Sequence, residues 1–190
     1  MTNIAIFASG SGSNAENIYN YFNDNNDVSI KLIITNNKNA FVIERAKKLG
    51  VDCKIINKKD FSDSGLVLNT LKEYNINFIV LAGFLLLIPE YLIENYSDKI
   101  INIHPALLPN YGGKGMYGMN VHNSVIENKE QQSGITIHYV NENYDEGNTI
   151  FQTKCEINEN DTPETLAEKI HKLEYEFFPK VIDDLLHKSK

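Results

Sequence analysis

The sequence of 190 residues contains a single arginine, Arg45, and its other fixed cations are lysines. A planar guanidinium is the side chain that grips a phosphate or a carboxylate through two parallel hydrogen bonds. Such a clamp is therefore nearly excluded from any binding site in this chain. An anionic ligand must be held instead by backbone N–H groups, hydroxyls, lysine or histidine.

The chain also lacks clusters of positive charge. Its formal net charge is −7, and no stretch of the sequence concentrates lysine. Because the phosphate backbone of a nucleic acid demands clustered cations, nucleic acid is not an expected partner. The acidic balance otherwise bears mainly on solubility.

Cysteines and long apolar runs are scarce as well. Cys53 and Cys155 are the only cysteines, and they lack the spacing of metal ligands, so we expect reduced thiols. No apolar run is long enough to span a membrane, and the first residues lack the basic segment of a signal peptide. These features predict a cytoplasmic protein without a membrane association.

Short apolar runs alternate with helical patterns along the first hundred residues. A continuous apolar run such as residues 78–82 is typical of a strand that is buried on both faces. The alternation predicts a parallel sheet with helices on both faces. Strands are expected at residues 4–8, 28–34, 51–56, 78–82 and 100–104, and helices at 15–18 and beyond, 41–49, 66–74 and 89–95.

The pattern changes after Pro109. A glycine-rich loop at residues 111–118 and a helix at 121–127 precede two strands, 133–140 and 149–157, which only a turn separates. These two strands should form an antiparallel pair. A capping signal at residues 161–164 then opens a long C-terminal helix with an apolar stripe. We therefore expect a single α/β domain, Rossmann-like and three-layered, with a mostly parallel sheet and an antiparallel C-terminal portion.

A polar loop at residues 9–14 joins the first strand to the first helix. Its glycines allow a close approach of the backbone, and the start of the following helix presents N–H groups and the positive end of the helix dipole. The loop lacks the lysine of a Walker motif and the third glycine of a dinucleotide fingerprint. It therefore favours a phosphomonoester over ATP or NAD, and a simple tight turn is the alternative.

The densest cluster of chemistry lies at residues 102–109. Asn102 and His104 are two residues apart on an expected strand, so their side chains should lie on one face. An amide and an imidazole aimed at one point could stabilise an oxyanion and move a proton. A capped strand with a solvated histidine would explain the same residues. Asp145 lies in a turn and could be an ordinary turn aspartate, and the apolar loop at residues 83–88 could be a ligand wall or core.

These motifs together resemble a known family. The segments 10–14, 81–84, 102–109 and 144–147 occur in the order and spacing of the phosphoribosylglycinamide formyltransferases, a branch of the folate-dependent formyltransferases. The resemblance extends from residue 3 to about residue 182. It implies transfer of a formyl group from 10-formyltetrahydrofolate to the amine of glycinamide ribonucleotide in purine (IMP) biosynthesis, without a metal, by an enzyme that can form a homodimer.

The resemblance also implies roles for individual residues within a single domain of residues 1–190, with a phosphate side in its N-terminal half and a folate side in its C-terminal half. Asn102, His104 and Asp145 match the catalytic trio, in which Asp145 would raise the pKa of His104 and hold it charged. The Leu108–Pro109 bond matches a cis proline of the family. Gly12, Ser13, Asn14, His171, Lys172 and Glu174 match residues that bind the ribonucleotide and its phosphate, and Leu85, Leu86, Leu87, Ile88, Asn102, Asn141, Glu142, Asn143, Tyr144 and Asp145 match residues that bind the folate.

Some positions depart from the family pattern, and other activities stay open. Leu86 and Ser64 stand where the family often has a basic residue and an arginine, so the grip on the folate tail and on the substrate is not defined. A formyltetrahydrofolate deformylase and a sugar-amine formyltransferase are the nearest alternatives. A tRNA formyltransferase would need a further basic domain. A non-catalytic phosphosugar-binding module would keep the first loop but has no use for the trio.

Overall fold

The computed structural model describes residues 1–188, and its chain forms two compact units, Met1–Ile101 and Asn102 onward. The boundary falls inside strand β5 (Ile100–His104). The seven strands are hydrogen-bonded in the order β3-β2-β1-β4-β5-β6-β7. Whether the two units fold as one domain stays a prediction.

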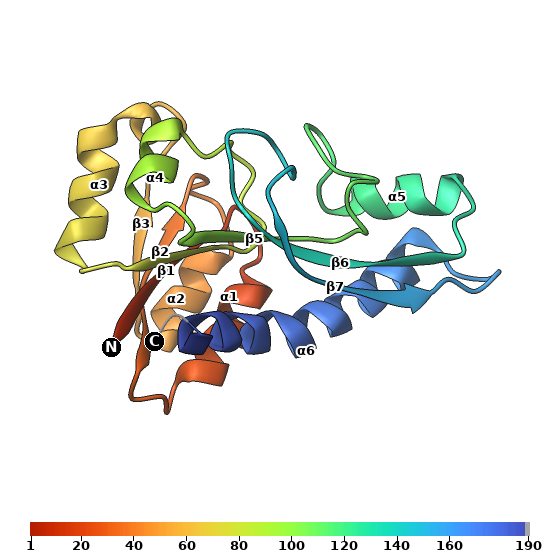
Figure 1. Ribbon diagram of the computed structural model, residues 1–190, viewed down its shortest axis with the longest axis horizontal. Helices are drawn as coiled ribbons and strands as arrows, with labels where there is room; N and C mark the ends of the chain where they lie inside the picture. Colours follow the sequence, from red (N-terminus) through yellow and green to blue (C-terminus); the bar gives the residue numbers. More distant parts are fainter. Residues whose placement is uncertain (189–190) are drawn as a thin grey trace. The chain divides into compact units, whose positions relative to one another are not determined.

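The first unit is built from parallel strands that alternate with helices (Figure 1). Strand β1 pairs in parallel with β2 and β4, and β2 pairs in parallel with β3. The elements are β1 (Thr2–Phe7), α1 (Ser13–Phe22), β2 (Val28–Thr35), α2 (Val42–Leu49), β3 (Asp52–Ile55), the short 3-10 helix η1 (Asp60–Ser62), α3 (Ser64–Glu73), β4 (Phe78–Leu81) and α4 (Glu90–Asn95).

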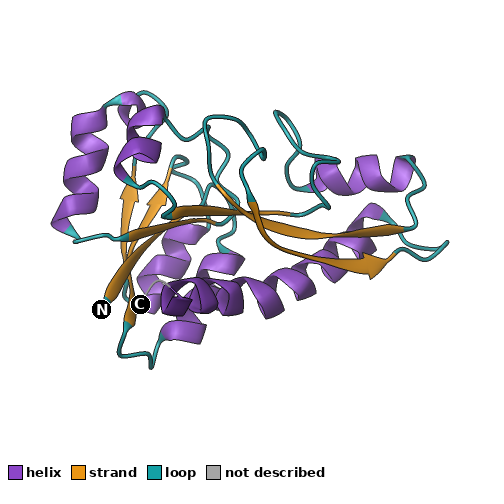
Figure 2. Ribbon diagram, in the orientation of Figure 1, coloured by secondary structure: helices purple, strands orange, loops and turns teal. Residues whose placement is uncertain are grey.

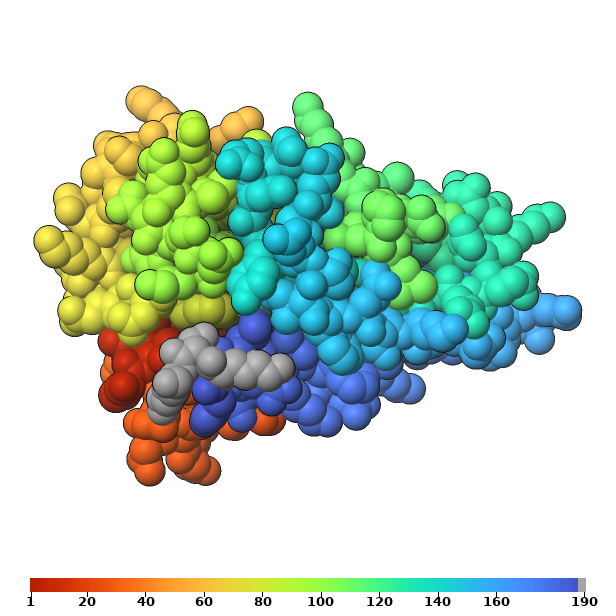
Figure 3. All heavy atoms as spheres, viewed as in Figure 1, coloured from red at the N-terminus to blue at the C-terminus, as the bar shows by residue number. Residues whose placement is uncertain are grey.

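Apolar residues in the central strands explain this arrangement. All four residues of β4 are buried, as are the last four of β1, so these strands accept helices on both faces. Gly50 ends α2 in the left-handed conformation, as a C-terminal glycine commonly does. Helices α3 and α4 pack together and form one continuous part of the surface, yellow to yellow-green in Figure 3.

The second unit is built around an antiparallel pair of strands. Strands β6 (Gln132–Tyr139) and β7 (Thr149–Glu156) pair antiparallel, which confirms the prediction for this part of the chain. Helix α6 (Pro163–Lys188) packs against both strands and against α5 (Met119–Glu127), as the ribbon shows (Figure 2). The predicted α/β class, with a mostly parallel sheet and an antiparallel C-terminal portion, is thereby confirmed.

The buried face of α6 differs in part from the apolar stripe expected from the sequence, which consists of Leu166, Ile170, Leu173, Phe177, Val181 and Leu185. Leu173 and Phe177 of this stripe are only half-buried, whereas Phe178 and Ile182, outside the stripe, are fully buried. The helix covers β6, β7 and α5, so its buried face is wider than a single stripe. Glu174 lies on this buried face with 6% of its surface exposed. No helix within residues 1–188 has the length and apolar character needed to cross a bilayer.

Candidate active site

In the first unit, the loop at residues 9–14 is held in one conformation by its surroundings. The backbone N–H of Ser9 donates to the Gly83 carbonyl at 3.0 Å, and its hydroxyl donates to Asn36 Oδ1 at 2.5 Å. Gly12 has a φ of +73°, and a Cβ there would lie 2.3 Å from Cγ2 of Val42. The positive φ favours glycine at this position. A side chain there would also clash with the rigid β-branched Val42.

The predicted phosphate-binding residues Gly12, Ser13 and Asn14 form the start of α1. Gly12 caps the helix without a side-chain hydrogen bond, and Asn14 is buried. The first N–H groups of a helix have no partner within the helix and carry the positive end of its dipole. The arrangement therefore suits an anion that approaches the backbone closely.

The apolar loop after β4 divides into exposed and buried residues. Leu85 and Leu87 are 43% and 42% exposed, Leu86 is half-buried, and Ile88 is only 3% exposed. The Leu85 N–H donates to the hydroxyl of Ser9 at 2.9 Å, so this loop and the 9–14 loop share a contact. The two exposed leucines can contact a flat apolar ligand, whereas Ile88 belongs to the core.

In the second unit, Asn102 and His104 both reach the carboxylate of Asp145. Asn102 Nδ2 donates to Asp145 Oδ1 at 3.3 Å, and His104 Nδ1 lies 3.4 Å from Asp145 Oδ2. The two side chains therefore lie on one face of β5, as their spacing predicts. The structure thus brings the three predicted catalytic side chains together.

The imidazole of His104 lies between two oxygen atoms. Its Nε2 lies 2.7 Å from the Tyr111 carbonyl oxygen, and its Nδ1 faces Asp145. Burial lowers the pKa of His104, and Asp145 and the Tyr111 carbonyl, which raise it, only partly offset that effect. The expected influence of Asp145 has the predicted sign, but the net pKa lies below the ordinary value. The expectation of a raised pKa overlooked how deeply the ring is buried.

The amide of Asn102 is oriented by His138, which lies one residue before the end of β6, beside Asp145. His138 Nδ1 lies 2.8 Å from the Tyr139 carbonyl oxygen, so in the neutral ring the proton is on Nδ1 and Nε2 can accept. Asn102 Nδ2 lies 3.1 Å from that Nε2. Reversing the amide would place its oxygen against the Asp145 carboxylate, and two hydrogen-bond acceptors would then face each other. Both hydrogens of Nδ2 are therefore engaged in this structure.

The carboxylate of Asp145 is stabilised in its charged form. The Gly113 N–H donates to Asp145 Oδ2 at 2.9 Å. Burial raises the pKa of Asp145, but His138, His104 and this backbone N–H together outweigh burial, and the pKa lies below its ordinary value. Gly112 allows the close approach of Asp145, because a Cβ at that position would lie 3.3 Å from Asp145 Cβ and 2.6 Å from Leu108 Cδ2. The Leu108–Pro109 bond is cis, as predicted.

The residues expected to bind the ribonucleotide from α6 lie on different faces of that helix. Glu174 is buried, whereas His171 and Lys172 are exposed. The ring of His171 stacks on that of Tyr175, with centroids 6.1 Å apart. The folate-binding residues expected at 141–145 form the loop between β6 and β7, and Asp145 has a positive φ of 59°.

Several polar groups near the trio were not expected from the sequence. They are His138, the carbonyl of Tyr111, the N–H of Gly113 and the buried imidazole of His122. Burial, together with His171 and His104, lowers the pKa of His122 to about 4. For His138, the sequence offered one signal: a histidine among the apolar residues of β6, on the same face of the strand as Thr136. The Tyr111 carbonyl and the Gly113 N–H could not be predicted, because every residue carries such backbone groups.

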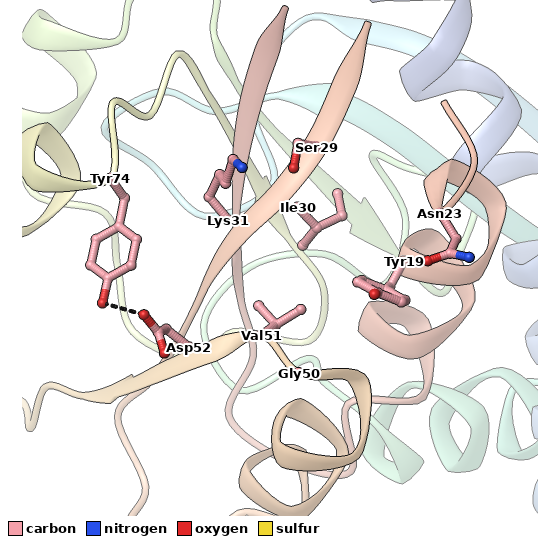
Figure 4. Close-up of a pocket in the computed structure, with 9 residues that line it drawn as sticks. All are labelled: Tyr19, Asn23, Ser29, Ile30, Lys31, Gly50, Val51, Asp52 and Tyr74. Atoms are coloured by element: carbon pink, nitrogen blue, oxygen red, sulfur yellow. Dashed lines mark hydrogen bonds between the residues drawn. The ribbon is translucent and has the colours of Figure 1, made fainter. Parts of the chain in front are cut away.

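A cavity of about 360 Å³ opens elsewhere in the first unit, beside the amino-terminal parts of β2 and β3 (Figure 4). Its walls include Lys31 and Asp52, and Asp52 accepts a hydrogen bond from the Tyr74 hydroxyl at 2.8 Å. None of the predicted site residues line it. Ligands of parallel sheets bind at the carboxyl ends of the strands, so this cavity lies at the end where no active site is expected.

Comparisons with known proteins agree with these features. Residues 2–182 match the family described as formyl transferase. The chain is 38% identical over 185 residues to the chloroplastic phosphoribosylglycinamide formyltransferase of Arabidopsis thaliana, with 94% of this chain and 63% of the plant protein covered. It is 38% identical over 191 residues to the phosphoribosylglycinamide formyltransferase of Bacillus subtilis, with 98% and 95% covered.

A solved structure shows the same fold. The phosphoribosylglycinamide formyltransferase of Bacillus halodurans superposes with a TM-score of 0.89 at 36% identity, and the match covers 100% of this chain and 97% of the other. The chain spans less than two thirds of the plant relative but nearly all of the two bacterial ones. On these matches and on the residues described above, the chain belongs to the formyl transferase family.

Proposed function

We propose that this protein transfers a formyl group from 10-formyltetrahydrofolate to the amine of glycinamide ribonucleotide in purine biosynthesis. The observation that carries the proposal is the convergence of Asn102 and His104 on the carboxylate of Asp145. Formyl transfer passes through a tetrahedral oxyanion, and this cluster combines hydrogen-bond donors with a buried carboxylate. The names of the family and of its relatives support the acceptor and the reaction.

The ribonucleotide would be held mainly by the backbone. We assign its phosphate to Gly12, Ser13 and Asn14 at the start of α1, where dipole and N–H groups favour an anion. Glu174 would accept hydrogen bonds from ribose hydroxyls, which suits a carboxylate held on the buried face of α6. His171 and Lys172, which are exposed on α6, are assigned to the ribonucleotide on the resemblance of the sequence alone.

The folate would be held by contacts of a different kind. Leu85 and Leu87, exposed on the loop after β4, can pack against the faces of the pterin. The loop at residues 141–145 supplies backbone groups for its polar edge, and Asp145 belongs to this loop. Neither set contains a cation for the glutamate tail, because Leu86 stands where the family often has a basic residue. Lys114, on the glycine-rich loop, is the candidate for that contact.

The chemical step moves one proton and exchanges two bonds to carbon. The amine nitrogen attacks the formyl carbon, and the carbonyl electrons move onto oxygen as the C–N bond forms. The attached nitrogen, now cationic and acidic, releases a proton to Asp145, directly or through a water. The oxyanion then re-forms the carbonyl as the bond between the carbon and the folate N10 breaks, and N10 takes up the proton that Asp145 received, so the carboxylate is restored and charge and atoms balance.

Charging of His104 accompanies this step. In the free protein burial lowers the pKa of His104, but a developing oxyanion nearby would raise it, because opposite charges favour the charged ring. His104 Nε2 donates to the Tyr111 carbonyl and Asn102 Nδ2 to His138 and Asp145. Each donor must therefore exchange one internal partner for the oxyanion when the substrate binds.

A spectrophotometric assay tests the proposal and its alternatives. Purified protein is mixed with 10-formyltetrahydrofolate or its dideaza analogue, with and without glycinamide ribonucleotide. Deformylation that requires the ribonucleotide would support the transferase. Deformylation without an acceptor would indicate a hydrolase, and reaction only with a sugar amine would indicate a sugar-amine formyltransferase. Phosphate-ester binding without any turnover would indicate a binding module.

Two broader expectations belong to the same proposal. We place the protein in the cytoplasm and expect it to form a homodimer, as the resemblance of its sequence implies. Cell fractionation tests the location. Light scattering across a range of protein concentrations tests the assembly, and a constant monomer mass at high concentration would contradict the dimer.

A further inference from the structure

We propose that Arg45, the only arginine of the chain, is a positioning residue that orients the phosphate-binding loop without binding the phosphate itself. The inference rests on the proposed role of the 9–14 loop. The loop, α1 and the segment at residues 37–45 are in contact within the first unit. An arginine near an anion site would ordinarily be taken as the anion's direct ligand, and here the donors Nε and Nη1 are directed to the Ser11 carbonyl and to Glu16.

Three consecutive carbonyl groups of the loop are bound from one side. The Ser9 carbonyl accepts from Asn37 Nδ2 at 3.4 Å. The Gly10 carbonyl accepts from the Val42 N–H at 3.1 Å, and the Ser11 carbonyl accepts from Arg45 Nε at 2.9 Å. All three donors belong to residues 37–45. The loop is thus fastened to this segment at each successive peptide group.

Fastening the carbonyls determines the direction of the N–H groups. In a planar trans peptide, the C=O of one residue and the N–H of the next point in opposite directions. The N–H groups of Gly10, Ser11 and Gly12 therefore point away from the 37–45 segment. Successive N–H groups that share a direction make an anion-binding concavity. Arg45 secures the last of the three peptide groups, directly before α1.

The charge of Arg45 is already compensated. Its Nη1 forms an ion pair with Glu16 of α1, and its guanidinium lies over the Phe41 ring, 5.1 Å from the centroid. Arg45 thereby links the carbonyl of Ser11 to the first turn of α1 through two different nitrogens. Lysine cannot replace it, because a single ammonium at the end of a flexible chain does not offer Nε and Nη1 together.

The test separates orientation from charge by comparing three variants. Arg45→Gln removes the contacts and the charge, and Lys47→Gln removes an exposed charge from the same helix. Glu16→Gln keeps the arginine but weakens its anchor. We expect Arg45→Gln to raise the KM for the ribonucleotide about tenfold, the loss typical of a charged hydrogen bond, with the KM for the folate unchanged. Lys47→Gln should leave both KM values unchanged.

The sign of the Glu16→Gln effect is the decisive readout. If Arg45 positions the loop, Glu16→Gln raises the KM for the ribonucleotide. If Arg45 acts by its charge, removing the neighbouring carboxylate lowers that KM, and the proposal is overturned. Equal effects of Arg45→Gln and Lys47→Gln would also overturn it. Thermal unfolding of each variant identifies any that fails to fold, and Glu16→Gln still gives the sign if Arg45→Gln is one of them.

A direct binding measurement keeps this inference separate from the proposed function. Ribose 5-phosphate is added to the protein, and the amide NMR signals of residues 10–14 are followed. We expect shifts in these signals that are reduced in Arg45→Gln. Shifts in the wild type without turnover of the ribonucleotide would contradict the proposed function alone. Equal shifts in the wild type and Arg45→Gln would contradict the role of Arg45.

Discussion

The two compact units carry polar sites of opposite character. In the first unit, the 9–14 loop presents backbone groups whose directions are set by hydrogen bonds from residues 37–45. In the second unit, Asp145 lies beside the imidazoles of His104 and His138, whose side chains are only 4% and 2% exposed. One site consists of fixed dipoles, and the other of buried groups that can gain or lose a proton.

The difference follows from what each site is proposed to hold. A phosphate ester stays negatively charged at neutral pH, so fixed N–H groups suffice and need not change during turnover. A carbonyl that becomes an oxyanion changes its charge during the reaction, so its site needs groups whose protonation can respond. Variants of the first site should therefore affect binding, and those of the second should affect the rate and its pH dependence.

The largest expected effect comes from removing the imidazole at the second site. His104→Ala should lower kcat at least about 10²–10³-fold, the loss typical for an oxyanion donor. The measurement is steady-state kinetics in the folate assay. His187→Ala, which removes an exposed imidazole from α6, is the matched control. Near-normal turnover of His104→Ala would disprove the mechanism.

Removing the carboxylate should change both the rate and the pH profile. Asp145→Asn should lower kcat about 10²-fold, because the proton path and the partner of His104 are lost. Asp145 raises the pKa of His104, so its removal lowers that pKa further. The alkaline decline of kcat, where His104 loses its proton, should therefore move to lower pH. Glu146→Gln is the control at the neighbouring residue. An unchanged pH profile of kcat in Asp145→Asn would exclude Asp145 from the proton path.

The buried His122 should make the second unit sensitive to acid. Its pKa in the fold is about 4, below the ordinary 6.5, so the unfolded chain binds the proton more readily. Its contribution to stability is complete above pH 6.5 and is lost as the pH falls toward 4. At pH 5 this loss is about 2 kcal/mol.

Urea unfolding at pH 7.5 and pH 5 tests this prediction with His122→Gln. The free energy of unfolding of the variant should fall less between the two pH values than that of the wild type. His104, whose pKa is also lowered, contributes in the same direction in both proteins, so the difference between them reports His122 together with its interaction with His104. An equal fall in both proteins would show that His122 does not carry the effect.

The smallest effect is expected from a side chain of the first site. Ser13→Ala removes one neutral hydroxyl from a loop that binds mainly through its backbone. The KM for the ribonucleotide should rise only about three- to tenfold, as for a single neutral hydrogen bond. The rise should be the same between pH 7 and 8.5, and kcat should not change. A large fall in kcat would contradict the expectation that variants of the first site affect only binding.

The strands and most helix positions could be predicted because each depends on local pattern. Strand β5 has the bounds expected from its apolar run, and Gly50 ends α2 where the sequence predicts. The buried face of α6 was only partly anticipated, because its width depends on three partners that packing supplies. The same holds for His122, which no short-range motif distinguishes from a surface histidine.

The candidate site was likewise predictable only in part. Spacing predicts that Asn102 and His104 share a face, since successive residues of a strand alternate. It does not predict that His138 orients the Asn102 amide or that the Tyr111 carbonyl binds His104. It also does not predict the net pKa of His104, because the opposing effects of burial and of Asp145 depend on depth and distance.

The sequence by itself determined the alternation of strands and helices, the polar residues at the strand ends and the scarcity of arginine. Those features depend on local periodicity and on composition. Only the tertiary structure decided how the groups are used: Asp145 meets two histidines and an amide, and Arg45 meets a backbone carbonyl and Glu16. Hydrogen bonding and desolvation act over a few ångströms, and folding brings residues distant in the sequence to that range.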